Sequence, residues 1–281
     1  VSAAIATVVP SMASAQLEEV LVTAERREAS VQDVPIAVSA YNEEMIEKLQ
    51  IDDTLDLINV VPNMFGGNNT GLGTANMYYL RAQGNDESIS TFDPPVGTYV
   101  DDVYITRQNV NNVALFDVER IEVLRGPQGT LFGRNPRGGV INVTPTTPTG
   151  QWCGNLQGTF GDQDMTDIKG VVNMPLGDRG GLKLAFKNFQ SDSHVYNTTL
   201  QDRRDFRDST TISASVRFDI SDDTSVMLTY DDYDHDTIAP DNLMVGPFPE
   251  ALTGYETSQS NDWKTSPQLN PLEAYCLLYT S

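Results

Sequence analysis

Apolar and polar residues alternate one by one along the second half of the chain. In the clearest run, residues 212–220, Ile, Ala, Val, Phe and Ile occupy the even positions, and Ser, Ser, Arg and Asp occupy the odd ones. Shorter runs with the same alternation occur at residues 156–160, 168–174, 182–186 and 226–230. A period of two places the apolar side chains on one face of a β-strand. The pattern therefore predicts five amphipathic, antiparallel strands of roughly ten residues each.

The connections between these strands differ in length in a regular way. Tight Gly/Asp turns occur at residues 175–181 and 221–225, whereas a long polar stretch covers residues 191–208. If the first strand starts on the periplasmic side, both tight turns lie on that side and the long loops lie outside, as in outer-membrane β-barrels. A soluble β-sandwich or jelly roll shows the same alternation without sorting its loops by length. Alternation alone leaves that soluble fold open.

The first half has a mixed pattern of short elements. Residues 17–23 and 36–38 are extended, and Asn42 is predicted to cap a helix that runs to Leu49. A second short helix is expected to start at Asp53 or Thr54 and to stop before Pro62. Gly, Pro and Asn turns separate four further strand candidates. These candidates are residues 77–80, 96–104, 121–124 and 140–143. The pattern predicts a compact α+β module.

Composition narrows the class of protein. The 281 residues carry 18 basic and 39 acidic side chains, a formal charge of −21, which argues against a nucleic-acid partner because phosphate binding needs clustered Lys and Arg. The mean hydropathy of −0.31 and the lack of an apolar run near 20 residues exclude a helical membrane protein but allow a β-barrel. With only two cysteines, a disulfide-stapled scaffold or a structural zinc site is not expected.

Both ends of the chain have segments that are not expected to belong to the fold. Residues 1–16, VSAAIATVVPSMASAQ, end in a small-x-small pattern before Gln16, which predicts the remnant of a secretory signal peptide over residues 1–15. The closing AYCLLYTS breaks the polar character of the preceding loop. Residues 275–281 are therefore expected to be artefactual, and Cys276 to have no functional role.

Three segments resemble one family. Residues 115–143, LFDVERIEVLRGPQGTLFGRNPRGGVINV, resemble the end of the plug domain of TonB-dependent outer-membrane receptors. Residues 96–107, VGTYVDDVYITR, resemble the preceding plug strand pair, and residues 17–24, LEEVLVTA, resemble the TonB box. The chain departs from the family pattern at Ala82, where the family usually has an Arg-Gly pair, and at Pro136. These departures put in doubt a tight glycine conformation at residue 82 and suggest a stiffer turn at residue 136.

The resemblance implies an α+β plug domain followed by an antiparallel transmembrane β-barrel of which about five strands are present. It divides the chain into a signal remnant (1–15), a TonB box with linker (16–30), a plug (31–149) and the start of the barrel (150–281). Five strands cannot close around a plug, whereas barrels of about 22 strands can. The chain is therefore expected to be a fragment of a Gram-negative outer-membrane protein in contact with outer-membrane lipid.

The resemblance also implies which residues act. The TonB box is expected to bind periplasmic TonB by β-strand addition, in which main-chain hydrogen bonds supply affinity. Its residues are Leu17, Glu18, Glu19, Val20, Leu21, Val22 and Thr23. On composition alone, the same segment is simply a short N-terminal strand. Plug arginines are expected to bind carboxylates of the barrel wall through charge-assisted hydrogen bonds. These are Arg81, Arg125 and Arg134, with Arg120 and Arg137 less strongly indicated. The alternative is that they are solvated surface charges.

Two Gly/Asn/Asp-rich stretches, residues 65–73 and 84–94, are predicted to be outward loops that bind a small ligand. The candidate contacts are Phe65, Asn68, Asn69, Asn85, Asp86 and Phe92. No catalytic residues, metal site or cofactor are expected, and no enzyme activity.

The function implied by the resemblance is energy-coupled import of a scarce ligand, with a ferric siderophore favoured by the family. One alternative is an exported β-sandwich that binds or cleaves carbohydrate, although no facing carboxylate pair is found. Another is a surface receptor that relays a signal through its N-terminus, which would need an extra domain before the TonB box.

Overall fold

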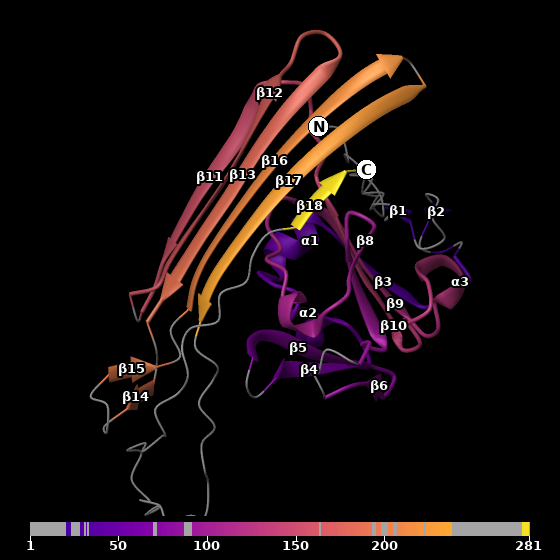
Figure 1. The fold of residues 1–281 in the computed structure, drawn as a ribbon, viewed down its shortest axis with the longest axis vertical. Helices are drawn as coiled ribbons and strands as arrows, with labels where there is room; N and C mark the ends of the chain where they lie inside the picture. Colours follow the sequence, from indigo (N-terminus) through magenta and orange to yellow (C-terminus); the bar gives the residue numbers. More distant parts are fainter. Residues whose placement is uncertain are drawn as a thin grey trace, which may run out of the picture.

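The chain folds into two parts that lie side by side: an α+β module from its first half and a sheet of long, tilted strands from its second half (Figure 1). The computed structural model describes residues 21–23, 29–30, 32, 34–69, 72–86, 92–162, 164–192, 195–197, 202–204, 207–221, 223–237 and 277–280. The expected signal remnant, residues 17–20 of the TonB box, and Cys276 lie outside these ranges. Within them, no helix is long and apolar enough to cross a membrane.

A five-stranded sheet in the order β3-β9-β10-β7-β8 forms the centre of the module. β10 pairs with β7 in parallel, and the other pairs are antiparallel. Both faces of the central strands are buried, with Ile121 and Ile141 in one apolar cluster and Leu124 and Val140 in the other. The strands are β3 (Val38–Asn42), β7 (Val96–Val100), β8 (Val103–Ile105), β9 (Val118–Arg125) and β10 (Gly139–Pro145).

Short elements cover this sheet. Asn42 caps the first helix, as predicted, by accepting a hydrogen bond from the Met45 amide at 2.9 Å. The helices are α1 (Glu43–Lys48), α2 (Leu57–Val60), η1 (Gln108–Val110) and α3 (Gly129–Phe132). The remaining strands of the module are β1 (Leu21–Val22), β2 (Ala29–Ser30), β4 (Met64–Asn69), β5 (Leu72–Leu80) and β6 (Gln83–Gly84).

The second half forms one antiparallel sheet in the order β11-β12-β13-β16-β17-β18. We call the first five of these strands the wall. They are β11 (Cys153–Phe160), β12 (Thr166–Pro175), β13 (Gly180–Ser191), β16 (Arg207–Ser221) and β17 (Thr224–Thr237). They are the five strands that the alternation predicted. The small pair β14 (Val195–Asn197) and β15 (Asp202–Arg204) lies between β13 and β16 in sequence, and β18 (Leu277–Thr280) pairs with β17.

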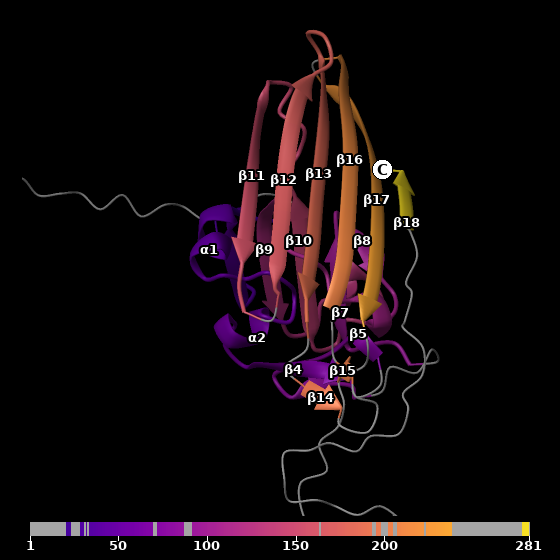
Figure 2. The same ribbon diagram turned by 90° about the vertical axis from the view of Figure 1, so that its left-hand side faces the viewer.

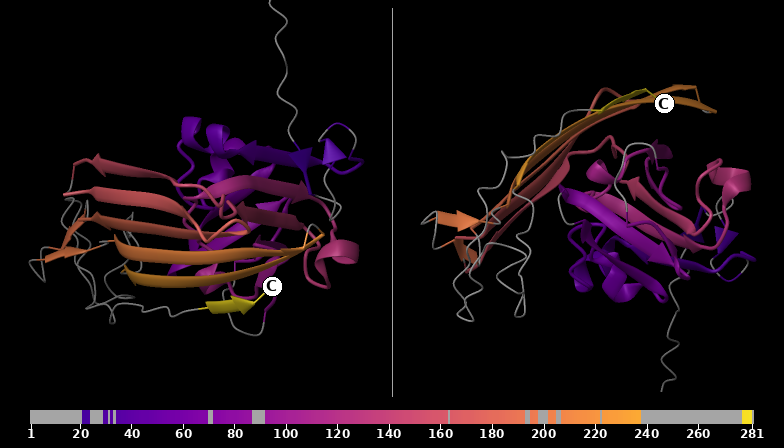
Figure 3. Two further views of the ribbon diagram at one scale, coloured as in Figure 1. Left: turned by 90° about the horizontal axis from the view of Figure 1, so that it is seen from above. Right: turned by 60° about the horizontal axis from the view of Figure 1, so that its bottom comes forward.

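The two faces of the wall are arranged in the opposite way to those of a soluble sheet. On β13, Lys183 and Lys187 are buried against the module, whereas Leu184 and Phe186 on the other face are each 41% exposed. Other strands continue this exposed apolar face with Leu156, Phe160, Ile212, Phe218 and Leu228. Figure 3 shows the sheet curving around the module. An exposed apolar band around a polar interior is the arrangement of a membrane barrel and excludes a soluble sandwich, which would bury that band.

Most wall connections sort by length, as expected, but the short connection between β11 and β12 lies at the same end as β14 and β15 (Figure 1). The short turns after β12 and after β16 lie at one end of the sheet, and the β14–β15 segment lies at the other (Figure 1). The hairpin of β4 and β5 lies at the same end as β14 and β15 (Figures 1 and 2). By the rule that long loops face outward, this end of the molecule is the external one. The described strands of this sheet do not close on themselves and form part of a barrel.

Three local expectations differ from the structure. Residues 64–69 form strand β4 instead of a loop, since Gly66 lets the backbone of Met77 and the side chain of Ile58 approach closely. Residues 96–104, one strand candidate by pattern, form the strand pair that the family resemblance implied, because Asp101 and Asp102 turn with φ of 48° and 64°. Aspartate tolerates this left-handed conformation better than most residues. Ala82 also turns, with φ of 62°, although it lacks the freedom of glycine.

Candidate functional site

A buried ion pair joins the module to the wall. Lys183 of β13 is 1% exposed, and its Nζ lies 2.5 Å from Oδ2 of Asp117, the residue before β9. The same ammonium donates to the Thr146 carbonyl at 2.5 Å and to Thr146 Oγ1 at 3.1 Å. Thr146 Oγ1 in turn donates to the other oxygen of Asp117. All three donor positions of the lysine are therefore satisfied, which is the condition under which a buried charge is tolerated.

A tyrosine of the wall makes a second contact. The Tyr233 hydroxyl on β17 accepts a hydrogen bond from the Ala114 amide at 2.7 Å and donates one to the Asn112 carbonyl at 3.2 Å. Both partners belong to the segment after η1. Because the Tyr233 hydroxyl bonds to two backbone groups, it fixes the position of this segment along the wall.

A polar network continues from this segment into the module. Asn112 Oδ1 accepts from Asn76 Nδ2 at 2.8 Å, and the same amide donates to the Tyr78 hydroxyl at 2.7 Å. Tyr78 donates to Thr54 Oγ1 at 2.9 Å. Burial raises the pKa of Tyr78 well above its usual value, so it stays a neutral donor. The network connects the wall contact of Tyr233 to β5, which belongs to the external hairpin.

The arginines predicted to bind the wall have partners within the module. Arg125 Nη1 donates to the Pro62 carbonyl at 3.4 Å, and Arg134 Nη2 lies 3.6 Å from Asp93 Oδ2. Arg81 Nη1 lies beside Gly126. None of the contacts among the described residues joins these three arginines to the wall. That these arginines bind carboxylates of the barrel stays a prediction. It concerns barrel strands other than the five described ones. The described ion pair has the opposite polarity, with the lysine on the wall and the carboxylate on the module.

The described end of the TonB box is docked on the module. β1 pairs with β2 and Val22 is fully buried, in the cluster that contains Leu124 and Phe132. The Thr23 main-chain amide donates to the carboxylate of Glu122, and Thr23 Oγ1 lies 3.1 Å and 3.3 Å from its two oxygens. The structure therefore gives the sequence-predicted Val22 and Thr23 a specific binding place.

A hydrogen bond joins two of the predicted ligand residues, Asn69 and Asp86, at the external hairpin. Asn69 Nδ2 donates to the Asp86 carbonyl at 3.0 Å, and Gln108 Nε2 donates to the Asn85 carbonyl at 3.2 Å. Phe65 and Phe92 are 73% and 56% exposed. Exposed aromatic rings and side-chain amides are groups that suit a ligand with flat apolar and polar parts. Their role in ligand binding stays a prediction.

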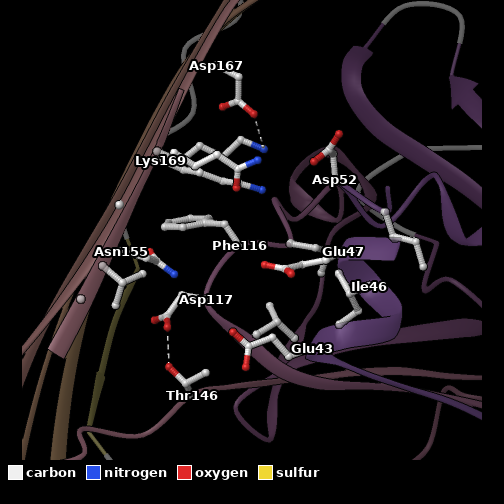
Figure 4. A pocket seen from close by; sticks show the side chains of 18 of the residues that line it. Glu43, Ile46, Glu47, Asp52, Phe116, Asp117, Thr146, Asn155, Asp167 and Lys169 are labelled. Carbon is white, nitrogen blue, oxygen red and sulfur yellow. Dashed lines mark hydrogen bonds and ion pairs between the residues drawn. The ribbon is translucent and has the colours of Figure 1, made fainter. Parts of the chain in front are cut away.

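A cavity of about 720 Å3 separates α1 from strands β11, β12 and β13 (Figure 4). Its two sides carry opposite charge. The module side has Glu43, Glu47 and Asp52, and the wall side has Lys169 and Lys187. Lys187 Nζ lies 3.9 Å from Asp167 Oδ2. The seam between module and wall is therefore polar along β11 to β13, unlike the apolar core of the module.

The carboxyl group of Asp101, in the turn between β7 and β8, leads to a prediction about how the stability depends on pH. Burial, followed by the neighbouring carboxylates of Asp102 and Asp231, raises the pKa of Asp101 from 3.8, while Lys183 lowers it. The folded protein therefore disfavours the ionised carboxylate of Asp101. The resulting loss of stability is absent below pH 3.8, grows as the pH rises from 3.8 to the raised pKa, and is constant above it. We expect Asp101→Asn to raise the free energy of unfolding at pH 7 by under about 1 kcal/mol, and to have no such effect at pH 3.

Thermal unfolding of the whole receptor at both pH values measures this effect. Asp102→Asn is the matched control, since it gives the same turn the same new side chain. Because the Asp102 carboxylate itself disfavours the ionised form of Asp101, its removal should also stabilise the protein, but less, since burial is the larger cause. Equal stabilisation by Asp101→Asn at pH 7 and at pH 3 would contradict an electrostatic origin.

Sequence reasoning missed Lys183, Tyr233, Asp117 and Glu122. The alternation did contain a partial indication for Lys183, which occupies a polar, inward position between Leu182 and Leu184. Its partner Asp117 is far away in the sequence, so no local pattern could have paired them.

The fold and these contacts define a class: an outer-membrane barrel wall with an internal plug held by polar contacts. Residues 30–140 match the family described as "TonB-dependent Receptor Plug Domain". Over this module and the first wall strands, the chain is therefore similar to the TonB-dependent receptors of Gram-negative outer membranes. We therefore call the α+β module the plug.

Curated relatives and solved structures show the same similarity. The chain is 24% identical over 211 residues to the vitamin B12 transporter BtuB of Vibrio vulnificus, covering 74% of this chain and 34% of that protein. It is 30% identical over 191 residues to the iron-regulated outer membrane virulence protein of Vibrio cholerae, covering 62% and 28%. The chain thus spans about a third of the length of these relatives.

Two solved structures show the same fold. The ferric yersiniabactin uptake receptor FyuA of Yersinia pestis superposes with a TM-score of 0.65 at 21% identity, covering 72% of this chain and 32% of that one. The pyoverdine receptor FpvA of Pseudomonas aeruginosa, bound to pyoverdine, gives 0.64 at 18% identity, covering 77% and 30%.

Proposed function

We propose that the protein imports a scarce ligand across the outer membrane with energy delivered by TonB, and that this ligand is a ferric chelate. The observation that carries the proposal is a plug fixed by Lys183 and Tyr233 to the polar inner face of a wall whose apolar face is exposed. A wide barrel filled in this way is closed to diffusion, so transport needs the plug to move. The outer membrane sustains no ion gradient, and the energy must reach the plug from the inner membrane.

The N-terminal strand is suited to receive that energy. TonB would add a strand to the TonB box through main-chain hydrogen bonds and pull on the plug through residues 25–33. The polar cavity between α1 and the wall offers a passage that costs little desolvation once α1 moves. Iron is favoured as cargo by relatives that are named as iron-regulated proteins or ferric chelate receptors.

Uptake measurements test the proposal. The complete receptor is expressed in a strain without its own ferric chelate receptors, and uptake of 55Fe bound to a tricatecholate, a trihydroxamate or citrate is compared with uptake of labelled cobalamin. We expect saturable uptake of at least one iron chelate that disappears without TonB or after a protonophore. Uptake of cobalamin alone would overturn the iron assignment, and uptake that persists without TonB would overturn the coupling.

A further inference from the structure

The plug contains a buried carboxylate whose partners include the end of the TonB box. Glu122 lies in the middle of β9 and has no exposed surface. From the plug sheet it is approached by Asn142 Nδ2, which donates to it at 3.3 Å, and by Arg120 Nε at 3.5 Å. A buried carboxylate needs several donors to offset the loss of water. The sheet itself supplies only part of them.

Thr23 supplies the rest. Its main-chain amide donates to Oε1 of Glu122, and its hydroxyl lies within hydrogen-bonding distance of both carboxylate oxygens. Hydrogen bonds to an ionised acceptor are about twice as strong as those between neutral groups. Departure of Thr23 would leave the carboxylate with unmet acceptors in a place that Val22 helps to keep dry. Val22 is itself fully buried beside Leu124 and Phe132.

These contacts compete with strand addition. A partner strand binds through main-chain amides and carbonyls, and the Thr23 amide is already committed to Glu122. The main chain of Leu21 and Val22 is also paired with β2. A strand of TonB can therefore pair with the whole TonB box only after Leu21, Val22 and Thr23 have left the plug.

We propose that Glu122 is a positioning residue that controls access to the TonB box: its carboxylate holds Thr23 on the plug and so lowers the affinity of the receptor for TonB until the strand is released. This inference rests on the proposed function and adds a residue of the plug, outside the TonB box, that sets when coupling begins. Removing the charge of Glu122 should favour the released state without altering the TonB box itself.

The test compares Glu122→Gln with Glu119→Gln in the complete receptor. The first change keeps the size of the side chain but removes the charge beside Thr23. The second makes the same change on the same strand, at a half-exposed carboxylate paired with Arg120. We expect the periplasmic domain of TonB to bind the Glu122→Gln receptor about tenfold more tightly than wild type, equivalent to about 1.4 kcal/mol. Glu119→Gln should stay within about twofold of wild type.

A synthetic peptide of residues 17–23 separates the possible failures. If the peptide binds TonB while wild type and Glu122→Gln bind it equally, the role of Glu122 is wrong and the proposed coupling stands. If TonB binds neither peptide nor receptor, the proposed coupling itself fails. A lower unfolding temperature of Glu122→Gln without a change in affinity would show a purely structural role and overturn the inference.

Amide hydrogen exchange on the wild-type receptor gives a second measurement, which needs neither TonB nor a folded variant. We expect the Thr23 amide to exchange at least about tenfold more slowly than in the free peptide, because it donates to a buried carboxylate. Exchange at the rate of the peptide would overturn the inference.

Discussion

Replacing Lys183 by methionine is expected to weaken the binding of the plug to the wall by about 3–5 kcal/mol, the usual cost of removing one partner of a buried ion pair. Methionine fills a similar volume, but it leaves the carboxylate of Asp117, which is 9% exposed, without its ammonium partner. It also leaves the Thr146 carbonyl without the lysine donor. Thermal unfolding of the complete receptor and the conductance of the receptor in planar bilayers would measure the effect, with a less stable plug and more frequent open events expected.

Lys169→Met is the matched control for this experiment. Lys169 lies on the neighbouring strand β12, lines the cavity and is half-buried, so the substitution removes the same charge from the same face of the wall. A second substitution, Asp117→Asn, should recover part of the loss in the Lys183→Met receptor, since it removes the uncompensated charge. Equal effects of the two lysine substitutions would show that the total charge of the wall matters and that the ion pair does not.

Replacing Val20 by proline is expected to weaken TonB binding by about 10- to 100-fold, the effect of losing one main-chain hydrogen bond in a strand interface at roughly 1–3 kcal/mol. Uptake of ligand should fall accordingly, while ligand binding at the external end should not change. Proline lacks the amide hydrogen and is poorly tolerated within a strand ladder. The substitution also leaves Val22 and Thr23 free to keep their contacts with the plug.

Val20→Ala provides the comparison, because it shortens the side chain and keeps the amide. It should retain most of the uptake if main-chain pairing supplies the affinity. Loss of uptake in both variants would indicate that the Val20 side chain is what TonB recognises, and unchanged uptake in the proline variant would rule out strand addition at this position.

Local patterns predicted elements well where one face of an element differs strongly from the other. The five wall strands followed from alternation, and the start of α1 followed from the capping residue Asn42. Strand β4 was missed because its sequence, MFGGNN, has neither alternation nor β-branched residues. Its strand conformation depends on pairing with β5, which is a contact between segments. The same reason explains why β14 and β15 were missed within a long polar loop.

The sequence by itself determined that this protein has a plug-like α+β module and a set of barrel strands, and it predicted a TonB box, because periodicity, turn residues and family motifs are local properties of the chain. The alternation indicated that the polar face of the wall points inward, but only the tertiary structure decided which charges pair across the boundary between wall and plug. Lys183 finds Asp117, and Glu122 finds Thr23, because folding brings distant segments into a buried space where each charge must have a partner. The need to satisfy buried charges, which no sequence window contains, therefore selected the residues that hold the plug and its N-terminal strand.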